Sequence, residues 1–124
     1  MIAADTSSLI AYFAGNSGGD TGLVQTALAN GQICLPPVVL TELLSDDKSR
    51  SRLEPVVVPW PLLEILDGYW VRAAQTRGLL LARGLKPKIP DTLIAQSCID
   101  HGVQLITRDD DFRPFAKHCG LKLA

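Results

Sequence analysis

Short apolar runs alternate along the chain with longer stretches in which apolar residues recur at helical spacing. The runs predict buried strands at residues 2–4, 33–35, 56–58, 103–107 and 121–123. The spacing between them predicts helices at residues 6–14, 20–30, 37–45, 62–84, 90–101 and 109–118, with a charged surface segment at 46–52. Strands that alternate with helices favour right-handed crossovers and parallel pairing. We therefore expect an α/β fold, a three-layer α/β/α sandwich around a short-stranded, mainly parallel sheet.

The longest helical pattern also predicts which side chains enter the core. Within residues 62–84, the apolar positions at helical spacing are Leu62, Leu66, Tyr69, Trp70 and Ala73. A tryptophan and a tyrosine on such a stripe belong more often to a core than to a surface that stacks nucleic-acid bases. The pattern therefore predicts that Trp70 is buried.

Composition narrows the class of protein. A chain of 124 residues that is 47% hydrophobic is sufficient for one core, and no repeat or linker divides it, so we expect a single domain at residues 1–124. The formal charge of −1 indicates neither a nucleic-acid binder nor a membrane-surface protein. No apolar run approaches the roughly 20 residues that cross a bilayer, and the first residues lack the basic start of a secretory signal. Cys34, Cys98 and Cys119 have no C-x-x-C spacing, which favours a reducing cytoplasm, with Cys34 and Cys98 as core residues.

Four acids occupy positions that a parallel α/β fold can bring together. Asp5 and Asp109 directly follow short apolar strands, and ligands of open α/β sheets sit outside the carboxyl ends of the strands. Asp91 and Glu42 lie on predicted helices that can reach the same rim. Taken singly, each acid has a simpler explanation as a helix cap, a partner of a helix dipole or a solvated side chain. Their joint placement predicts a cleft instead.

Such a cluster predicts a bound cation. Carboxylates a few ångströms apart repel one another, and each unit of pKa shift corresponds to about 1.4 kcal/mol. A divalent cation removes that cost, and all-oxygen ligation is what Mg²⁺ or Mn²⁺ prefers. A cation held by carboxylates can bind a phosphate oxygen and activate water. The acids therefore suggest hydrolysis of a phosphate ester.

The same segments resemble a known family. Asp5-Thr6-Ser7 after the first strand, Glu42 within VVLTELLS, PDTLIA at residues 90–95 and LITRDDDF at residues 105–112 resemble, in order and spacing, the PIN-domain ribonucleases. The resemblance is strongest to the VapC-type toxins of bacterial toxin–antitoxin pairs and covers essentially the whole chain. It implies a Mg²⁺- or Mn²⁺-dependent endoribonuclease that is inhibited by a cognate antitoxin and is a homodimer.

The resemblance also implies roles for individual residues. Asp5 and Asp91 would be metal ligands, with Glu42 and Asp109 completing the catalytic acids. The hydroxyl of Thr6 or Ser7 would hold a ligand carboxylate or a phosphate. Asp111 also matches an acid of the family segment, and among Asp109, Asp110 and Asp111 we prefer Asp109 because it is nearest to the strand end.

Basic residues near these acids are candidates for RNA contacts. Arg108 adjoins the acid triplet, and Lys86 and Lys88 precede Asp91, so these side chains could meet RNA phosphates along the cleft. For the two lysines, a solvated connector is an equally good explanation.

Two other functions compete with the ribonuclease. A small phosphatase or phospho-acceptor domain would use Asp5 as a nucleophile, but haloacid-dehalogenase-type phosphatases need a second aspartate where this chain has Ser7. A non-catalytic PIN-like binding module would have lost an acid, and all four are present. The sequence leaves open the RNA target, the antitoxin, the oligomeric state and the number of metal ions.

Overall fold

The computed structural model describes residues 1–124 and has a parallel sheet at its centre. The strands are β1 (Ile2–Ala4), β2 (Ile33–Cys34), β3 (Gln104–Ile106) and β4 (Lys122–Leu123). They lie in the order β2-β1-β3-β4, and every neighbouring pair is parallel. The predicted α/β fold with a short-stranded parallel sheet is confirmed.

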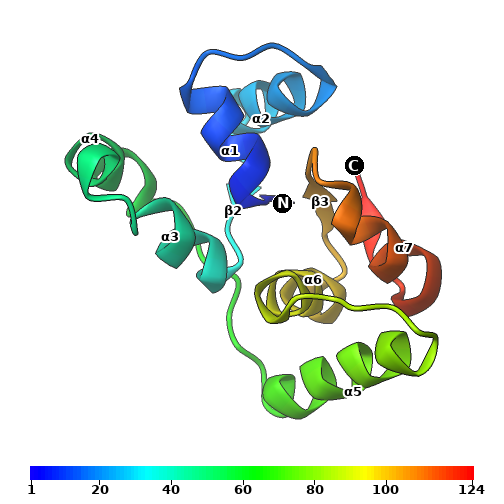
Figure 1. Ribbon diagram of the computed structural model, residues 1–124. Coiled ribbons are helices and arrows are strands. Elements are labelled where there is room, and N and C mark those ends of the chain that lie inside the picture. Colours follow the sequence, from blue (N-terminus) through cyan, green and yellow to red (C-terminus); the bar gives the residue numbers. More distant parts are fainter.

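Helices cover both faces of this sheet. They are α1 (Thr6–Phe13), α2 (Gly19–Ala29), α3 (Pro37–Leu43), α4 (Asp47–Val57), α5 (Tyr69–Ala82), α6 (Ile89–His101), the 3₁₀ turn η1 (Asp110–Phe112) and α7 (Arg113–Cys119). From β1 the chain moves to the edge of the sheet at β2. It then crosses back past β1 to β3 and continues in the same direction to β4. Right-handed crossovers then place α1 and α2 on one face and α5, α6 and α7 on the other. Figure 1 shows this arrangement, with α1 and α2 above the strands and α5 and α6 below them.

The centre of the sheet is buried from both sides. Ala3 and Ala4 of β1 and Leu105 and Ile106 of β3 are at most 1% exposed. The small alanine side chains leave room for helices to approach β1 closely, and the larger aliphatic side chains of β3 fill the adjoining space. This rigid pair of strands carries the acids that follow each of them.

The strand predicted at residues 56–58 is wrong. Asp46 caps α4 by accepting a hydrogen bond from the Lys48 amide, and the helix continues to Val57. Only Val57 of the three valines is buried, so this segment presents a helical stripe and not a strand face. The neighbour of β2 comes later in the chain, as a single parallel bridge between Leu35 and Leu62. A run of β-branched residues is a weak signal because tertiary packing overrides local preference.

The helix predicted at residues 62–84 begins later than expected, at Tyr69. Leu63 donates a backbone hydrogen bond to the Leu35 carbonyl, which keeps the preceding segment extended. Gly68 then adopts a left-handed conformation with φ of +81°, and α5 starts directly after it. Tyr69 is buried at 2% exposure, but Trp70 is 63% exposed, so the prediction of a buried Trp70 is wrong.

The helix start predicted at residue 37 and the helix end predicted at residue 101 are confirmed. Pro37 is the first residue of α3, and Gly102 follows the last residue of α6 in a left-handed conformation. Cys34 and Cys98 are buried, as predicted.

None of the helices combines the length and the apolar character needed to span a bilayer.

Candidate active site

The carboxyl ends of β1 and β3 lie side by side and bring two distant segments together. Ala4 pairs with Ile106 in the sheet, and the Asp5 amide continues the ladder by donating to the Ile106 carbonyl at 3.0 Å. The next residue along β3 is Thr107, whose hydroxyl donates to Asp5 Oδ2 at 2.8 Å. The register of two short strands therefore fixes Asp5 against the segment that contains Asp109.

Asp5 is an almost fully buried carboxylate with every contact satisfied. Its side chain is held by the Ser8 amide at 3.2 Å and the Ser7 hydroxyl at 2.7 Å on Oδ1, opposite Thr107 on Oδ2. The contact with Ser8 makes Asp5 the N-cap of α1, which confirms that interpretation of this residue. Burial raises the pKa of the Asp5 carboxyl, the hydrogen bonds from Ser7, Thr107 and Ser8 oppose this, and the nearby Asp109 charge adds to the rise.

Three other acids meet beside Asp5. Asp91, in the first turn of α6, lies with Asp109 and Asp111 so that one carboxylate oxygen from each falls within 4.8 Å of the others. Asp109 accepts a hydrogen bond from the Asp111 amide at 2.9 Å, and this cap of η1 turns Asp111 back toward Asp91. Asp110 is not part of this cluster and forms an exposed ion pair with Arg113 at 3.1 Å. Within the triplet, both Asp109 and Asp111 reach the cluster.

The cluster is electrostatically strained. Burial, together with the charges of Asp109, Asp111 and Glu42, raises the pKa of Asp91 to about 6, against the opposing charge of Lys88. Asp91 is therefore partly protonated near neutral pH in the absence of a cation. Carboxylate oxygens with this excess of negative charge are suitable ligands for a divalent cation such as Mg²⁺ or Mn²⁺.

Glu42 is exposed on α3, outside the three-acid cluster but near enough for its charge to raise the pKa of Asp91. Its Oε1 accepts a hydrogen bond from the Thr6 hydroxyl at 2.6 Å. The two hydroxyls singled out from the sequence, Thr6 and Ser7, therefore each donate to a different carboxylate, Glu42 and Asp5. The structure brings three of the five predicted acids, Asp91, Asp109 and Asp111, into one cluster. Asp5 and Glu42 lie outside it, near enough for charge effects between Asp5 and Asp109 and between Glu42 and Asp91. The catalytic and metal-binding roles of all five stay predictions.

A polar cavity of about 210 Å³ adjoins the acids. Its lining residues are Leu85, Lys86, Pro87, Lys88, Asp91, Asp110, Asp111 and Pro114. Two lysines and three aspartates therefore line the same cavity. This juxtaposition of positive and negative side chains suits a phosphodiester that approaches a carboxylate-bound cation.

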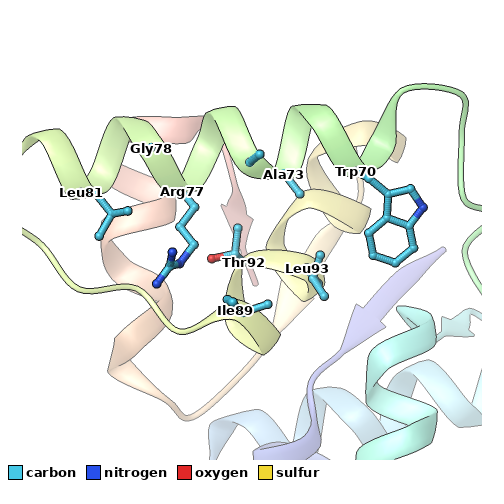
Figure 2. Close-up of a pocket in the computed structure, with 9 residues that line it drawn as sticks. Trp70, Ala73, Arg77, Gly78, Leu81, Ile89, Thr92 and Leu93 are labelled. Atoms are coloured by element: carbon cyan, nitrogen blue, oxygen red, sulfur yellow. The ribbon is translucent and has the colours of Figure 1, made fainter.

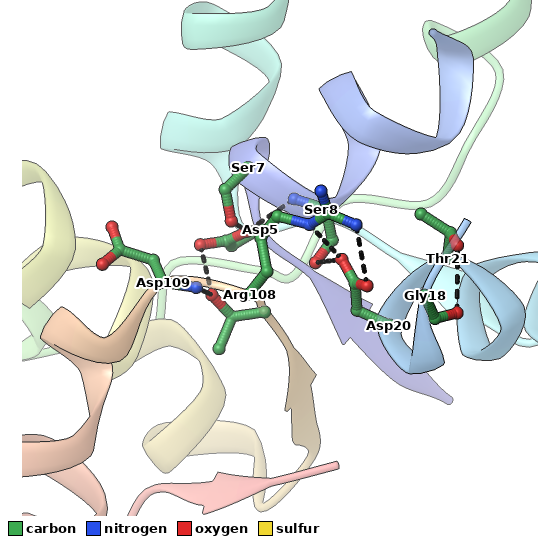
Figure 3. A network of polar contacts seen from close by, with 9 residues as sticks. Asp5, Ser7, Ser8, Gly18, Asp20, Thr21, Arg108 and Asp109 are labelled. Atoms are coloured by element: carbon green, nitrogen blue, oxygen red, sulfur yellow. Dashed lines mark hydrogen bonds and ion pairs between the residues drawn. The ribbon is translucent and has the colours of Figure 1, made fainter. Parts of the chain in front are cut away.

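Arg108 is committed to a different partner. Its guanidinium forms a bidentate pair with Asp20 at the start of α2, with Nε and Nη2 at 2.8 and 3.0 Å from the two carboxylate oxygens. Asp20 also accepts from the buried Ser8 hydroxyl at 2.8 Å (Figure 3). The guanidinium that we predicted to contact RNA is therefore bound to Asp20 in the structure.

Sequence reasoning did not single out Asp20, Ser8 or Thr107. From the sequence, Asp20 is only the first residue of a predicted helix. Thr107 could have been found, because it is the first polar residue after β3 and its register partner follows β1 directly. Asp20 gave no such signal, because it is 88 residues from Arg108.

The comparison with known families decides the assignment. Residues 2–118 match the family described as the PIN domain. The chain belongs to the PIN-domain family. Its relatives include a VapC ribonuclease of Mycobacterium bovis and ribonuclease VapC11 of Mycobacterium tuberculosis, each 31% identical to it over the whole of this chain and 98% of the relative.

Solved PIN-domain structures share the fold. The chain is similar to VapBC2 from Rickettsia felis bound to a DNA fragment from its promoter, with a TM-score of 0.78, 20% identity and coverage of 100% of this chain and 98% of that one. It is also similar to a toxin–antitoxin complex from Klebsiella pneumoniae, with a TM-score of 0.70, 21% identity and coverage of 98% and 95%. At these identities the likeness concerns the PIN fold alone.

Proposed function

We propose that this PIN-domain chain is a divalent-metal-dependent endoribonuclease that acts as the toxin of a toxin–antitoxin pair. The observation that carries the proposal is the meeting of Asp91, Asp109 and Asp111 at the carboxyl end of the sheet, beside a cavity whose lining includes Lys86 and Lys88. The 31% identity to VapC ribonucleases along the whole chain supports RNA as the substrate. On this proposal residues 1–124 act together as one domain in the cytoplasm.

Asp91, Asp109 and Asp111 would hold Mg²⁺ or Mn²⁺, and Asp5 and Glu42 would complete the acidic set. A bound cation would supply charge neutralisation at the scissile phosphate and a lowered pKa for an attacking water. Hydrolysis forms a bond from the water oxygen to phosphorus and breaks the bond from phosphorus to the 3′ oxygen, which takes up a proton. The products carry a 5′-phosphate and a 3′-hydroxyl.

The remaining residues position these groups. Lys86 and Lys88 would contact the phosphates of the RNA where it enters the cavity. Thr6 and Ser7 orient Glu42 and Asp5 through their hydroxyls, which fixes the carboxylates before any cation or RNA arrives.

The phospho-acceptor alternative fits this geometry poorly. Asp5, its nucleophile, is 3% exposed, and both of its carboxylate oxygens accept hydrogen bonds. A nucleophile needs an oxygen that can approach phosphorus. Absence of a beryllofluoride adduct on Asp5 is therefore the result we expect.

Cleavage of RNA by the purified chain tests the proposal directly. We expect a single-stranded RNA substrate to be cut internally in the presence of Mn²⁺ or Mg²⁺, with products that carry 5′-phosphate ends. End-labelling with and without prior phosphatase treatment identifies those ends. Undiminished cleavage in excess EDTA, or products with 2′,3′-cyclic phosphates, would contradict the mechanism.

Expression in bacteria tests the proposed partner. We expect the chain to arrest growth, and co-expression of a small antitoxin protein from a neighbouring reading frame to relieve the arrest. The matched control is the Asp91→Asn variant, which should not arrest growth at the same level of soluble protein. Toxicity that persists in this variant would point to a cause other than RNA hydrolysis.

We further propose that the chain forms a homodimer through exposed apolar residues of α5 and the start of α6. Trp70 and Ile89 are 63% and 58% exposed, and they border a cavity of about 310 Å³ between the two helices. Figure 2 shows Trp70 at one end of this cavity, with Leu93 and Ile89 along its floor. Apolar side chains gathered in this way mark surfaces that another protein covers.

Replacing Trp70 with glutamate should therefore yield a monomer. A carboxylate buried without a partner at such an interface costs several kcal/mol, and each 1.4 kcal/mol or so weakens association about tenfold. Size-exclusion chromatography with light scattering gives the mass. The control is Val58→Glu, which adds the same charge at an exposed valine at the end of α4 and should leave the mass unchanged. A wild-type chain that is monomeric at all concentrations would refute the dimer.

A further inference from the structure

Five residues form a ring beside the clustered acids. Four of its links are hydrogen bonds or an ion pair, and the fifth is the peptide bond between Thr107 and Arg108. Figure 3 shows the part around Asp5, Ser8, Asp20 and Arg108. Asp20 accepts from the Ser8 hydroxyl and from the Arg108 guanidinium. The Ser8 amide donates to one oxygen of Asp5, and Thr107, the chain neighbour of Arg108, donates to the other. The ring therefore joins the starts of α1 and α2 to the loop that follows β3.

The ion pair in this ring differs from an ordinary surface pair. The side chains of Asp20 and Arg108 are 12% and 37% exposed, and their contact is bidentate. The hydrogen bond from Arg108 lowers the pKa of Asp20 to about 2, although partial burial opposes the shift. By contrast, the pair of Arg113 with Asp110 is 74% and 77% exposed. Bidentate pairs shielded from solvent hold their geometry better than exposed ones.

The loop before α2 is shaped around this pair. Gly18 has φ of +155°, and a Cβ atom built there would lie 2.7 Å from Asp20 Oδ1 and 3.2 Å from Arg108 Nη2. Any larger residue would displace the carboxylate or the guanidinium. The glycine therefore leaves the space that the ends of these two side chains fill.

The position of Arg108 in the chain links the pair to the acids. Arg108 lies between Thr107, which donates to Asp5, and Asp109, which is one of the three clustered carboxylates. The Asp109 amide also donates to the Thr107 hydroxyl at 3.0 Å. Fixing the central residue of this tripeptide restrains both neighbours.

We propose that Arg108 is a positioning residue of the site. Through its pair with Asp20 it holds Thr107 and Asp109 against Asp5, and it does not bind RNA. The proposal rests on the ribonuclease function proposed above. A displacement of a catalytic group by about 1 Å can cost on the order of 100-fold in rate, so a residue that contacts no substrate can still matter to the chemistry.

Kinetics of Arg108→Ala, Asp20→Ala and the double variant test this role. We expect kcat to fall about 10- to 100-fold in each single variant while KM for an RNA oligonucleotide stays within about twofold. The double variant should be no worse than either single one, because both remove the same contact. Direct RNA binding predicts a different pattern, in which Arg108→Ala raises KM and weakens the salt dependence while Asp20→Ala, which frees the guanidinium, does neither. That pattern would overturn the proposal.

Binding of Mn²⁺ to the same variants, measured by isothermal titration calorimetry, gives a readout that does not depend on turnover. Misplaced carboxylates should weaken Mn²⁺ binding by about tenfold or more.

If an alanine variant does not fold, Arg108→Lys and Asp20→Asn are used in its place. Each keeps a single hydrogen bond, so the loss of kcat and of Mn²⁺ affinity should be smaller and in the same direction. The control is Arg113→Ala, which removes the exposed pair of the same segment and should match the wild type in Mn²⁺ affinity and in both kinetic constants.

The outcomes separate the two proposals. Folded Arg108 and Asp20 variants with wild-type Mn²⁺ affinity and kcat would overturn the positioning role and leave the ribonuclease intact. A wild-type chain that neither binds Mn²⁺ nor cleaves RNA would overturn both.

Discussion

Replacing Asp91 with asparagine is expected to abolish RNA cleavage without unfolding the chain. Asp91 contributes one of the three clustered carboxylate oxygens, and its neutral replacement is a poorer cation ligand. We expect a loss of at least about 100-fold in kcat/KM, the usual consequence of removing a group on which the transition state depends. A gel assay with a fluorescent RNA measures the loss.

The same substitution should leave stability without metal unchanged or higher. The raised pKa of Asp91 shows that its charge is unfavourable beside Asp109 and Asp111, and asparagine removes that charge while it keeps nearly the same shape. The gain is on the order of 1 kcal/mol after solvent screening, or a rise in Tm of a few °C.

The comparison variant for Asp91 is Asp110→Asn. This acid belongs to the same triplet but pairs with Arg113, so its replacement should cost much less activity. Equal losses in the two variants would show that net charge near the cavity, and not the clustered ligand oxygens, carries the effect. Cleavage by Asp91→Asn within a few-fold of the wild type would refute its role in the site.

Stability of the metal-free chain should fall as pH rises from about 4 to about 6. Because the pKa of Asp91 is raised from 3.8 to about 6, the folded state binds its proton more tightly than the unfolded state, and this advantage disappears as pH passes through that interval. The pKa of Asp5 is also raised, with the same sign. The expected loss in the free energy of unfolding is on the order of 1–2 kcal/mol after allowance for solvent.

Asp20 affects stability in the opposite direction. Because its pKa is lowered to about 2, the stabilisation that its charge provides is lost as pH falls below about 4.

A divalent cation should reverse this loss. Mn²⁺ competes with the proton for the same oxygens, so its stabilising effect should be small near pH 5 and larger near pH 7.5. Thermal scans in EDTA and in excess Mn²⁺ across this interval measure both effects. Asp91→Asn should flatten the pH dependence in EDTA and reduce the response to Mn²⁺. A wild-type Tm that rises steadily from pH 4 to pH 6 in EDTA would contradict the electrostatic account.

The parts of the fold that followed from the sequence are those fixed by local chemistry. Asp5 caps a helix directly after an apolar strand, and Gly102 ends one directly before the next. These signals place β1 and β3 and, through parallel register, the acids that follow them. The valines at residues 56–58 failed as a signal because only the core decides whether such a run pairs as a strand or packs as one helical stripe.

Several contacts of the site could not be predicted from the sequence, because they join residues that only the fold brings together. No pattern in the triplet at residues 109–111 distinguishes its members, and the 3₁₀ turn that directs Asp109 and Asp111 to Asp91 depends on a cap that only the folded loop makes. The pair of Arg108 with Asp20 joins residues that share no local periodicity. Trp70 was misplaced because helical spacing defines a stripe but does not determine how much of it the rest of the chain covers.

Asp5 both caps α1 and is a proposed acid of the site, which determines how a mutation at this position would inactivate the proposed toxin. Asparagine caps helices as well as aspartate does, and its amide can still meet the hydroxyls of Ser7 and Thr107. An Asp5→Asn chain should therefore be folded, silent as a nuclease and still a full binding partner for its antitoxin. In a cell that also makes the active chain, such a decoy would titrate antitoxin away and release the active copies, so a loss-of-function allele at this position would behave as a harmful one.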